Sequence, residues 1–375
     1  MRRKTGQRTL SLIRTNRKVM VAAVILIILG ALWVAYNATF GPPDYRAEPE
    51  QFTVTTGMDD SNEVATALLE QGFIKSEAGF RIALMDPEEL QAVCVDCIMP
   101  GAYKISKTMN VWELVSVMKK GPYMKWIPIQ EGLRKEQIAE ILAQTLHWDQ
   151  KTQYEWVMEH TAAQDEYREG VYFPDTYLIP VDEEPAKVAE RFRAKFNEKF
   201  APYAQETQNQ NIKWTTLINI ASLVQREAAN KNDMPIVAGI IWNRLLEGMR
   251  LQLDATVQYA RDTKLFESTA KPPSQLGNLL QIFQTNAQSS NSPQALVEWW
   301  KPITPEDKEI DSPYNTYIHE GLPPSPIANP GLDAIEAALY PEETDCIYYI
   351  HDRSGTIHCA ETYDKHRANI SEYLR

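Results

Sequence analysis

Glu227 is the residue of this chain whose position best suits acid–base chemistry. It lies late in the segment 214–230, in which apolar residues recur at helical spacing. A rotation of about 100° per residue puts Glu227 between Ile220 and Leu223, at the edge of the apolar face. Contact with that face and the negative end of the helix dipole would both raise the pKa of its carboxyl. A carboxyl protonated near neutral pH suits a general acid; the alternative is a side chain that simply reaches water.

The charge of the chain is very uneven. Residues 1–18 hold seven lysines and arginines and no acid, which leaves 31 basic and 50 acidic residues, a net charge of −19, in the rest. The eighteen residues 19–36 are uncharged, about the length of one bilayer span. The basic flank predicts a cytoplasmic N-terminus, with residues 37–375 outside and a Pro-containing linker at 37–50. An uncleaved anchor is favoured over a cleaved signal peptide because the apolar run is longer than the usual signal core. The acidic ectodomain argues against nucleic acid as a ligand.

A β-α pattern recurs three times within residues 51–148. Each unit has a short alternating segment, a turn and an amphipathic helix. Small modules of this kind resemble LysM-type glycan-binding domains, and the alternative is a generic α+β spacer. Residues 149–375 are expected to form a larger mixed α/β domain, with a polar, exposed insertion at 261–310. The predicted fold class is therefore α+β, preceded by a transmembrane helix.

Four cysteines form two pairs in the sequence, Cys94 with Cys97 and Cys346 with Cys359. An even count outside the cytoplasm favours disulfides, and Cys346 and Cys359 flank a predicted hairpin that a cross-strand bridge would close. The alternatives are four free thiols, or a zinc site that adds His358. Zinc would require the two pairs to meet across more than 240 residues of sequence. No metal site is predicted.

Several segments carry a resemblance to a known family. They are Ala-Ser-Leu-Val-Gln-Arg-Glu at 221–227, the blocks at 237–245 and 248–259, Ser-Pro-Tyr-Asn-Thr-Tyr and the Pro-rich stretch within 312–331, and Glu-Gly-Val-Tyr-Phe-Pro-Asp-Thr-Tyr at 169–177. Together they resemble the MltG (YceG-like) endolytic murein transglycosylases over nearly the whole chain from about residue 19. The resemblance implies that Glu227 is the catalytic glutamate.

The chain departs from the family pattern at three places. Gln225 stands where another acid is usual, Leu-Asp-Ala at 253–255 replaces the commoner Ser-Asp-Pro, and Ser325 replaces a glycine. None of these changes removes Glu227, and the loss of an acid at Gln225 favours a mechanism with a single carboxylate. The stretch at 261–310 is usually much shorter in the family, so its effect on the cleft is open.

The chemistry that the resemblance implies needs one carboxyl, where most glycosidases need two. Glu227 would protonate the glycosidic oxygen that leaves C1 of N-acetylmuramic acid (MurNAc). The resulting glutamate would accept the proton of the sugar's C6 hydroxyl as that oxygen closes on C1, which gives a 1,6-anhydroMurNAc end. A group that serves twice needs a pKa near the working pH.

Polar and aromatic side chains in the same blocks are candidates for binding the glycan. They are Asn243, Gln252, Asp254, Thr256, Tyr314, Asn315, Thr316 and Tyr317. Amides and hydroxyls suit the acetamido and hydroxyl groups of the sugar, tyrosines suit its ring faces, and Asp254 suits a positioning role. The alternative for each is a hydrogen bond within a turn or the core.

The sequence therefore predicts a single-pass protein of the cell (inner) membrane that cleaves the MurNAc–GlcNAc bond within nascent peptidoglycan strands, without a cofactor. The resemblance also implies penicillin-binding proteins as partners. Two alternatives remain open, a catalytically silent glycan-binding scaffold and a muramidase-type hydrolase that leaves ordinary reducing ends.

Overall fold

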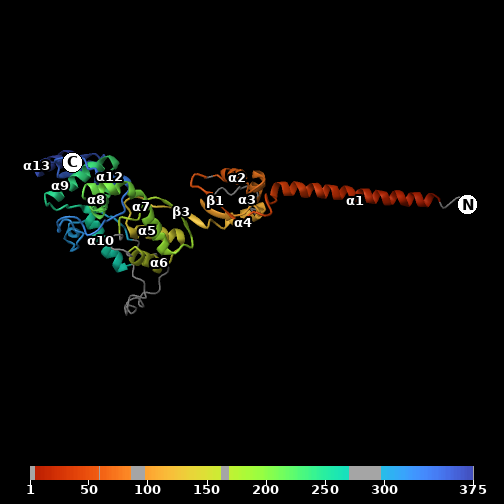
Figure 1. Ribbon diagram of the computed structural model, residues 1–375, viewed down its shortest axis with the longest axis horizontal. Helices are drawn as coiled ribbons and strands as arrows, with labels where there is room; N and C mark the ends of the chain where they lie inside the picture. Colours follow the sequence, from red (N-terminus) through yellow and green to blue (C-terminus); the bar gives the residue numbers. More distant parts are fainter. Residues whose placement is uncertain (1–4, 59, 86–97, 162–168, 270–296, 375) are drawn as a thin grey trace, which may run out of the picture. The chain divides into compact units, whose positions relative to one another are not determined.

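The chain divides into two compact units, Met1–Trp126 and Ile127–Arg375, in the computed structural model (Figure 1). The structure describes residues 5–374 except 59, 86–97, 162–168 and 270–296. The division falls before the predicted boundary at 148, so the third β-α repeat lies mostly in the second unit. Cys94 and Cys97 lie outside the described residues.

The first unit begins with a long helix, α1 (Thr5–Phe40). Its segment Val19–Phe40 is long and apolar enough to cross a membrane, and none of its most apolar stretch is buried. The predicted span at 19–36 lies within this segment. The unpacked apolar surface is compatible with a single-pass anchor.

The rest of the first unit contains the expected short strands and helices. They are β1 (Glu50–Val54), α2 (Ser61–Glu70), α3 (Glu77–Leu84), β2 (Gly101–Ile105), α4 (Val111–Lys119) and β3 (Met124–Pro128), which continues into the second unit. β1 pairs antiparallel with β2, with Phe52 opposite Tyr103, and both rings are buried with Leu68, Phe80 and Leu114. Among the described residues between β1 and β2 there are two helices, α2 and α3, where the repeat pattern predicts one. The likeness to LysM domains stays a prediction.

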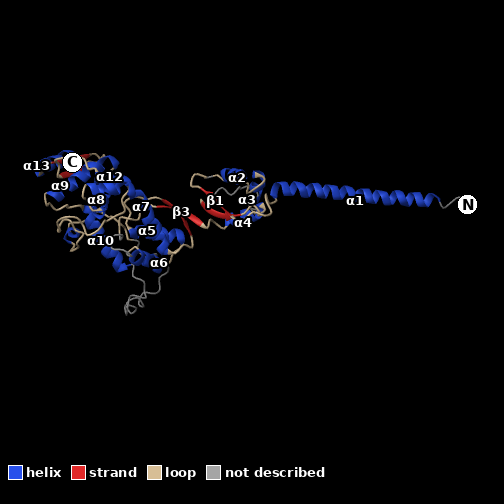
Figure 2. Cartoon of the chain, in the orientation of Figure 1, coloured by secondary structure: helices blue, strands red, loops and turns tan. Residues whose placement is uncertain are grey.

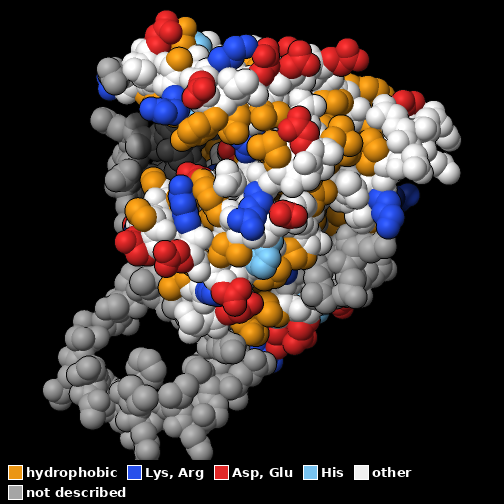
Figure 3. Space-filling view, turned by 90° about the vertical axis from the view of Figure 1, so that its left-hand side faces the viewer, with side chains coloured by type: hydrophobic (Ala, Val, Ile, Leu, Met, Phe, Trp, Pro, Cys, Tyr) orange, Lys and Arg blue, Asp and Glu red, His pale blue; other side chains and the backbone are white. Residues whose placement is uncertain are grey.

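The second unit is mainly helical (Figure 2). Its elements are α5 (Lys135–Leu146), α6 (Gln150–Glu155), η1 (Trp156–His160), β4 (Thr176–Pro180), α7 (Pro185–Asn209), α8 (Trp214–Glu227), η3 (Lys231–Asp233), α9 (Met234–Leu246), α10 (Asp254–Thr269), η4 (Glu306–Glu309), α12 (Leu332–Leu339), β5 (Tyr348–His351), β6 (Ile357–Ala360) and α13 (Tyr363–Tyr373). Helix α8 contacts α7, α9, α10 and α12. Its apolar residues are therefore buried on several sides. On the face of the molecule that Figure 3 shows, charged and hydrophobic side chains are mixed.

The polar stretch at 261–310 is more ordered at both ends than the sequence predicts. Helix α10 continues to Thr269, and Asp262 within it is only 1% exposed. The Asp262 carboxylate accepts a hydrogen bond from the Trp300 backbone N–H at 2.8 Å. A charged residue in a polar sequence suggests exposure, but here it is buried against a backbone donor. Residues 270–296 lie outside the described part.

The C-terminal hairpin confirms one predicted disulfide. Strands β5 and β6 pair antiparallel, and Cys346 is bonded to Cys359 with their Cα atoms 5.8 Å apart. These thiols are therefore not available as zinc ligands. His358, the histidine of the zinc alternative, pairs with Asp352 at 2.9 Å. Among the described residues, no group of three or more His, Cys, Asp or Glu side chains could hold a metal ion.

Candidate active site

Helix α8 is fixed tightly, and it presents Glu227 at its last position. Leu217, Ile220 and Val224 are fully buried on its apolar face. Two polar residues on the same helix hold the Pro-rich segment that follows residue 320. Asn219 donates to the Pro323 carbonyl at 2.7 Å, and the Ser222 hydroxyl accepts from the Ile327 N–H at 3.1 Å. The predicted helix is confirmed, and its C-terminal end is held on two sides.

The Glu227 carboxyl is half-buried and meets two hydrogen-bond donors. The Tyr349 hydroxyl on β5 donates to Oε2 at 2.7 Å, and the Ala255 backbone N–H in the first turn of α10 also donates to the carboxyl. Burial raises the pKa of Tyr349, so its hydroxyl keeps the proton that it donates. Glu227 therefore lies where α8 ends, α10 begins and the C-terminal hairpin approaches.

Opposing effects act on the pKa of Glu227, and burial is the largest of them. Burial raises the pKa, and the nearby Asp254 carboxylate adds to the rise. The hydrogen bonds from Tyr349 and Ala255 lower it, as does the positive charge of Arg244. The net effect is a raised pKa, as the sequence predicts. A carboxyl with a raised pKa holds its proton more readily than an ordinary glutamate, as a general acid requires.

Asp254 and Tyr317 lie beside this carboxyl and are paired with each other. The Tyr317 hydroxyl donates to Asp254 Oδ1 at 2.5 Å. Burial, with the Asp254 hydrogen bond next, raises the pKa of Tyr317, and the charge of Glu227 adds to the rise. Asp254 is exposed and Tyr317 is half-buried. Both residues thus have surface left for a ligand beside Glu227.

Arg244 on α9 holds the two segments that flank Glu227. Its Nε donates to the Ile347 carbonyl at 2.6 Å, and its guanidinium also donates to the Leu251 carbonyl. Ile347 leads into β5 with Tyr349, and Leu251 leads into the first turn of α10. Because Arg244 is buried, its charge is directed at these carbonyls rather than at solvent. It therefore positions both donors to Glu227.

At 253–255 the chain has Leu-Asp-Ala where the family usually has Ser-Asp-Pro, and this difference affects the hydrogen bonds to Glu227. Proline has no backbone N–H, whereas Ala255 donates one to Glu227. The other two departures also have partners. Gln225 Oε1 accepts from the Gly331 N–H at 3.0 Å, and the Ser325 hydroxyl bonds the Tyr314 hydroxyl at 2.7 Å. All three positions therefore take part in hydrogen bonds within the same unit.

The other predicted glycan-binding residues mostly hold loops. Thr256, Asn315 and Thr316 are at most 1% exposed and lack the surface to touch a glycan. Thr256 and Thr316 bond each other at 2.9 Å, and Asn315 donates to the Lys308 and Ile310 carbonyls at 2.9 Å. Their amides and hydroxyls thus form the core hydrogen bonds given above as the alternative.

The three remaining candidates keep some surface. Asn243 donates to the Thr344 carbonyl, the Tyr314 ring lies 4.8 Å from that of Tyr259, and Gln252 is exposed with a positive φ of 50°.

Two residues beside Glu227 were missed from the sequence. Arg244 lies in a block quoted for the resemblance, and Tyr349 lies in a hairpin considered only for its cysteines. Nothing local in the sequence distinguishes Tyr349 from the adjacent Tyr348.

Comparison with known proteins supports the resemblance. Two proteins of Streptococcus pneumoniae strains named endolytic murein transglycosylase are each 26% identical over 360 residues. These matches cover 86% of this chain, which spans only 58% of the pneumococcal proteins. A Bacillus subtilis protein of the same name is 26% identical over 341 residues, 83% of this chain and 81% of the relative.

A solved structure of a yceG-like protein from Listeria monocytogenes is 24% identical, with a TM-score of 0.48, over 86% of this chain and 99% of that one. The YceG-like family matches residues 52–372, which include nearly all of both units after α1. This match spans every residue placed around Glu227, and the chain belongs to the YceG-like family.

Proposed function

We propose that this protein is an endolytic peptidoglycan lytic transglycosylase that cleaves the MurNAc–GlcNAc bond within glycan strands and leaves 1,6-anhydroMurNAc ends. The observation that carries the proposal is the Glu227 carboxyl, half-buried with a raised pKa and held by the Tyr349 hydroxyl at 2.7 Å. The names of the Streptococcus and Bacillus relatives support the reaction class and the glycan as substrate.

The mechanism follows from the two protonation states of Glu227. As the acid, Glu227 protonates the glycosidic oxygen that leaves C1 of MurNAc. As the conjugate base, it takes the proton of the C6 hydroxyl while the C6 oxygen bonds to C1. Tyr349 and Ala255 stabilise the carboxylate that exists between the two steps, whereas burial favours the acid that begins and ends the cycle. Both states therefore have a stabilising feature in the site.

A hydrolase is the second candidate, because Asp254 lies close enough to raise the pKa of Glu227. A second carboxylate could activate water, as in most glycosidases. The Asp254 carboxylate, however, accepts the Tyr317 hydroxyl at 2.5 Å, which favours a positioning role. The transglycosylase is preferred because its chemistry needs only the carboxyl that is buried.

The proposal includes anchoring by α1, with residues after Phe40 outside the cytoplasm. The apolar segment Val19–Phe40 and the seven basic residues before it support this orientation. The disulfide between Cys346 and Cys359 suits an oxidising compartment. Nascent strands beside the membrane would then be in reach, and penicillin-binding proteins remain the expected partners.

The test is mass spectrometry of the products that the full chain, in non-ionic detergent, releases from purified peptidoglycan. Wild type is compared with Glu227→Gln, with Asp254→Asn, and with Glu190→Gln as a control for an exposed carboxyl of α7. We expect anhydro ends from wild type, Glu190→Gln and, at reduced rate, Asp254→Asn. Glu227→Gln should give none.

The products decide between the candidates. Ordinary reducing ends, lost in both Glu227→Gln and Asp254→Asn, would establish the hydrolase. Glycan that is bound but left intact by the wild type would instead establish the silent scaffold.

A further inference from the structure

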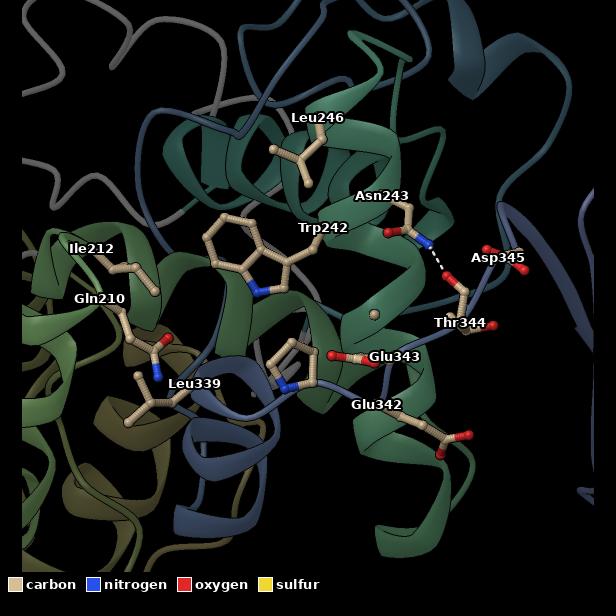
Figure 4. Close-up of a pocket in the computed structure, with 12 residues that line it drawn as sticks. Gln210, Ile212, Trp242, Asn243, Leu246, Leu339, Glu342, Glu343, Thr344 and Asp345 are labelled. Carbon is tan, nitrogen blue, oxygen red and sulfur yellow. Dashed lines mark hydrogen bonds between the residues drawn. The ribbon is translucent and has the colours of Figure 1, made fainter.

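The second unit has a pocket of about 690 Å³, within the range of ligand sites. Helix α9 contributes Trp242, Asn243 and Leu246, and the loop after α12 contributes Glu342 to Asp345 (Figure 4). Gln210 and Ile212, which follow α7, line the other side. Of the described residues that contact or influence Glu227, none lines this pocket.

The walls of the pocket are held in place by the fold. A Cβ at Gly239 would lie 2.3 Å from the Glu342 carbonyl oxygen, so glycine allows the loop to lie directly on α9. The Asn243 amide donates to the Thr344 carbonyl at 2.6 Å, shown dashed in Figure 4. The Trp242 indole N–H donates to a carbonyl near the end of α12 at 2.9 Å. The pocket is therefore formed before any ligand arrives.

An apolar surface forms one side of the pocket. Trp242 and Leu246 are four residues apart on α9, so they lie on one face of the helix. Leu246 is 81% exposed, which is unusual for a large apolar side chain of a packed unit. Ile212 adds apolar surface on the other side of the pocket. A ligand with an aliphatic group would remove this apolar surface from water.

The loop after α12 carries hydrogen-bond acceptors and negative charge. Glu342, Glu343 and Asp345 are exposed, and none of them has an ion pair within the described part of the chain. The Asn243 amide nitrogen is already used by two backbone carbonyls, so its oxygen is left as an acceptor. Acceptors beside an apolar surface match a cation on an aliphatic stem.

We propose that this pocket binds a basic segment of a partner polypeptide. A lysine or arginine would lay its stem along Trp242 and Leu246 and direct its cationic head to the carboxylates of the loop. An apolar side chain next to it would cover the rest of Leu246. A peptide segment fits better than a muropeptide, because the carboxylates of a muropeptide would meet Glu342 and Glu343 with the same charge. The proposal does not depend on the reaction at Glu227.

The test uses a fluorescein-labelled, end-capped peptide, Gly-Lys-Lys-Leu-Lys-Lys-Gly, and the full chain in non-ionic detergent. Binding is followed by anisotropy at two salt concentrations. Two further peptides replace every lysine by glutamate, or the leucine by serine. The protein variants are Leu246→Ser and the double variant Glu342→Gln with Glu343→Gln. A matched control neutralises two exposed carboxylates elsewhere, Glu190→Gln with Glu267→Gln.

We expect the lysine peptide to bind the wild type and the control equally. The double variant should bind it about three- to tenfold more weakly, with a smaller salt effect, and Leu246→Ser about tenfold more weakly. Equal affinity for the glutamate peptide, or no loss in either pocket variant, would overturn the proposal. So would a disaccharide-tetrapeptide that competes with the lysine peptide and binds more tightly, because the pocket would then belong to the substrate.

Discussion

Removal of the Tyr349 hydroxyl is the sharpest test of how Glu227 is tuned. Tyr349→Phe keeps the ring in place and removes the donor that lies 2.7 Å from Glu227 Oε2. That hydrogen bond favours the charged carboxylate and so lowers the pKa of Glu227 against the larger effect of burial. Without it the pKa rises further, and the acid form persists to higher pH.

The size of the effect follows from the kind of hydrogen bond. A hydrogen bond to a charged group contributes about 1.5–3 kcal/mol. Because 1.36 kcal/mol corresponds to one pH unit of titration, the alkaline limb of the kcat/KM profile should move up by about one to two pH units. Below the limb both proteins hold the acid, so any difference there reflects positioning alone.

The assay measures release of anhydro ends across the pH range for wild type, Tyr349→Phe and Tyr348→Phe. Tyr348 is the neighbour on the opposite face of β5, so its variant removes a hydroxyl without touching Glu227. Thermal unfolding checks that all three proteins fold equally well. If the limb of Tyr349→Phe stays at the wild-type pH while the fold is intact, the proposed balance at Glu227 is refuted.

Three further predictions concern a donor to Glu227, a buried ion pair and the hairpin disulfide, all in the second unit. Ala255→Pro removes the other donor to Glu227 at a position where helices tolerate proline, so the alkaline limb should again move up in the same assay. Arg134→Met leaves the Glu136 carboxylate buried without its cation, and denaturant unfolding should show a loss of about 3–5 kcal/mol. Cys359→Ser opens a bridge that spans 13 residues, and the same measurement should show a loss of about 3 kcal/mol.

The sequence predicts α8 and its glutamate because their signals are local. Apolar spacing defines the buried face of the helix, and the position of Glu227 at its edge already implies a raised pKa. The partners of that carboxyl are not local. Tyr349 lies 122 residues further along the chain, and only the packing of the C-terminal hairpin brings its hydroxyl to Glu227. Patterns of residue spacing do not relate residues that lie so far apart in the sequence.

The glycan-binding candidates show a second limit. Hydroxyls and amides suit sugars and buried turns equally well, so residue type alone does not decide between them. Thr256 and Thr316 are 60 residues apart and bond each other in the core, whereas Asp254, only two residues before Thr256, remains exposed beside Glu227. The direction of each side chain in the first turn of α10 decides the outcome, and that direction depends on tertiary contacts.

Glu227 is placed between two helix ends that act on it in opposite directions. It is the last residue of α8, where the dipole disfavours negative charge, and it accepts an N–H from the first turn of α10, where the dipole favours it. The start of α10 favours the charged carboxylate and therefore favours loss of the proton. The end of α8 favours the neutral acid and therefore favours keeping the proton. A carboxyl that must do both within one turnover needs neither state to be strongly preferred. The meeting of α8 with α10 therefore suits a single group that acts first as an acid and then as a base.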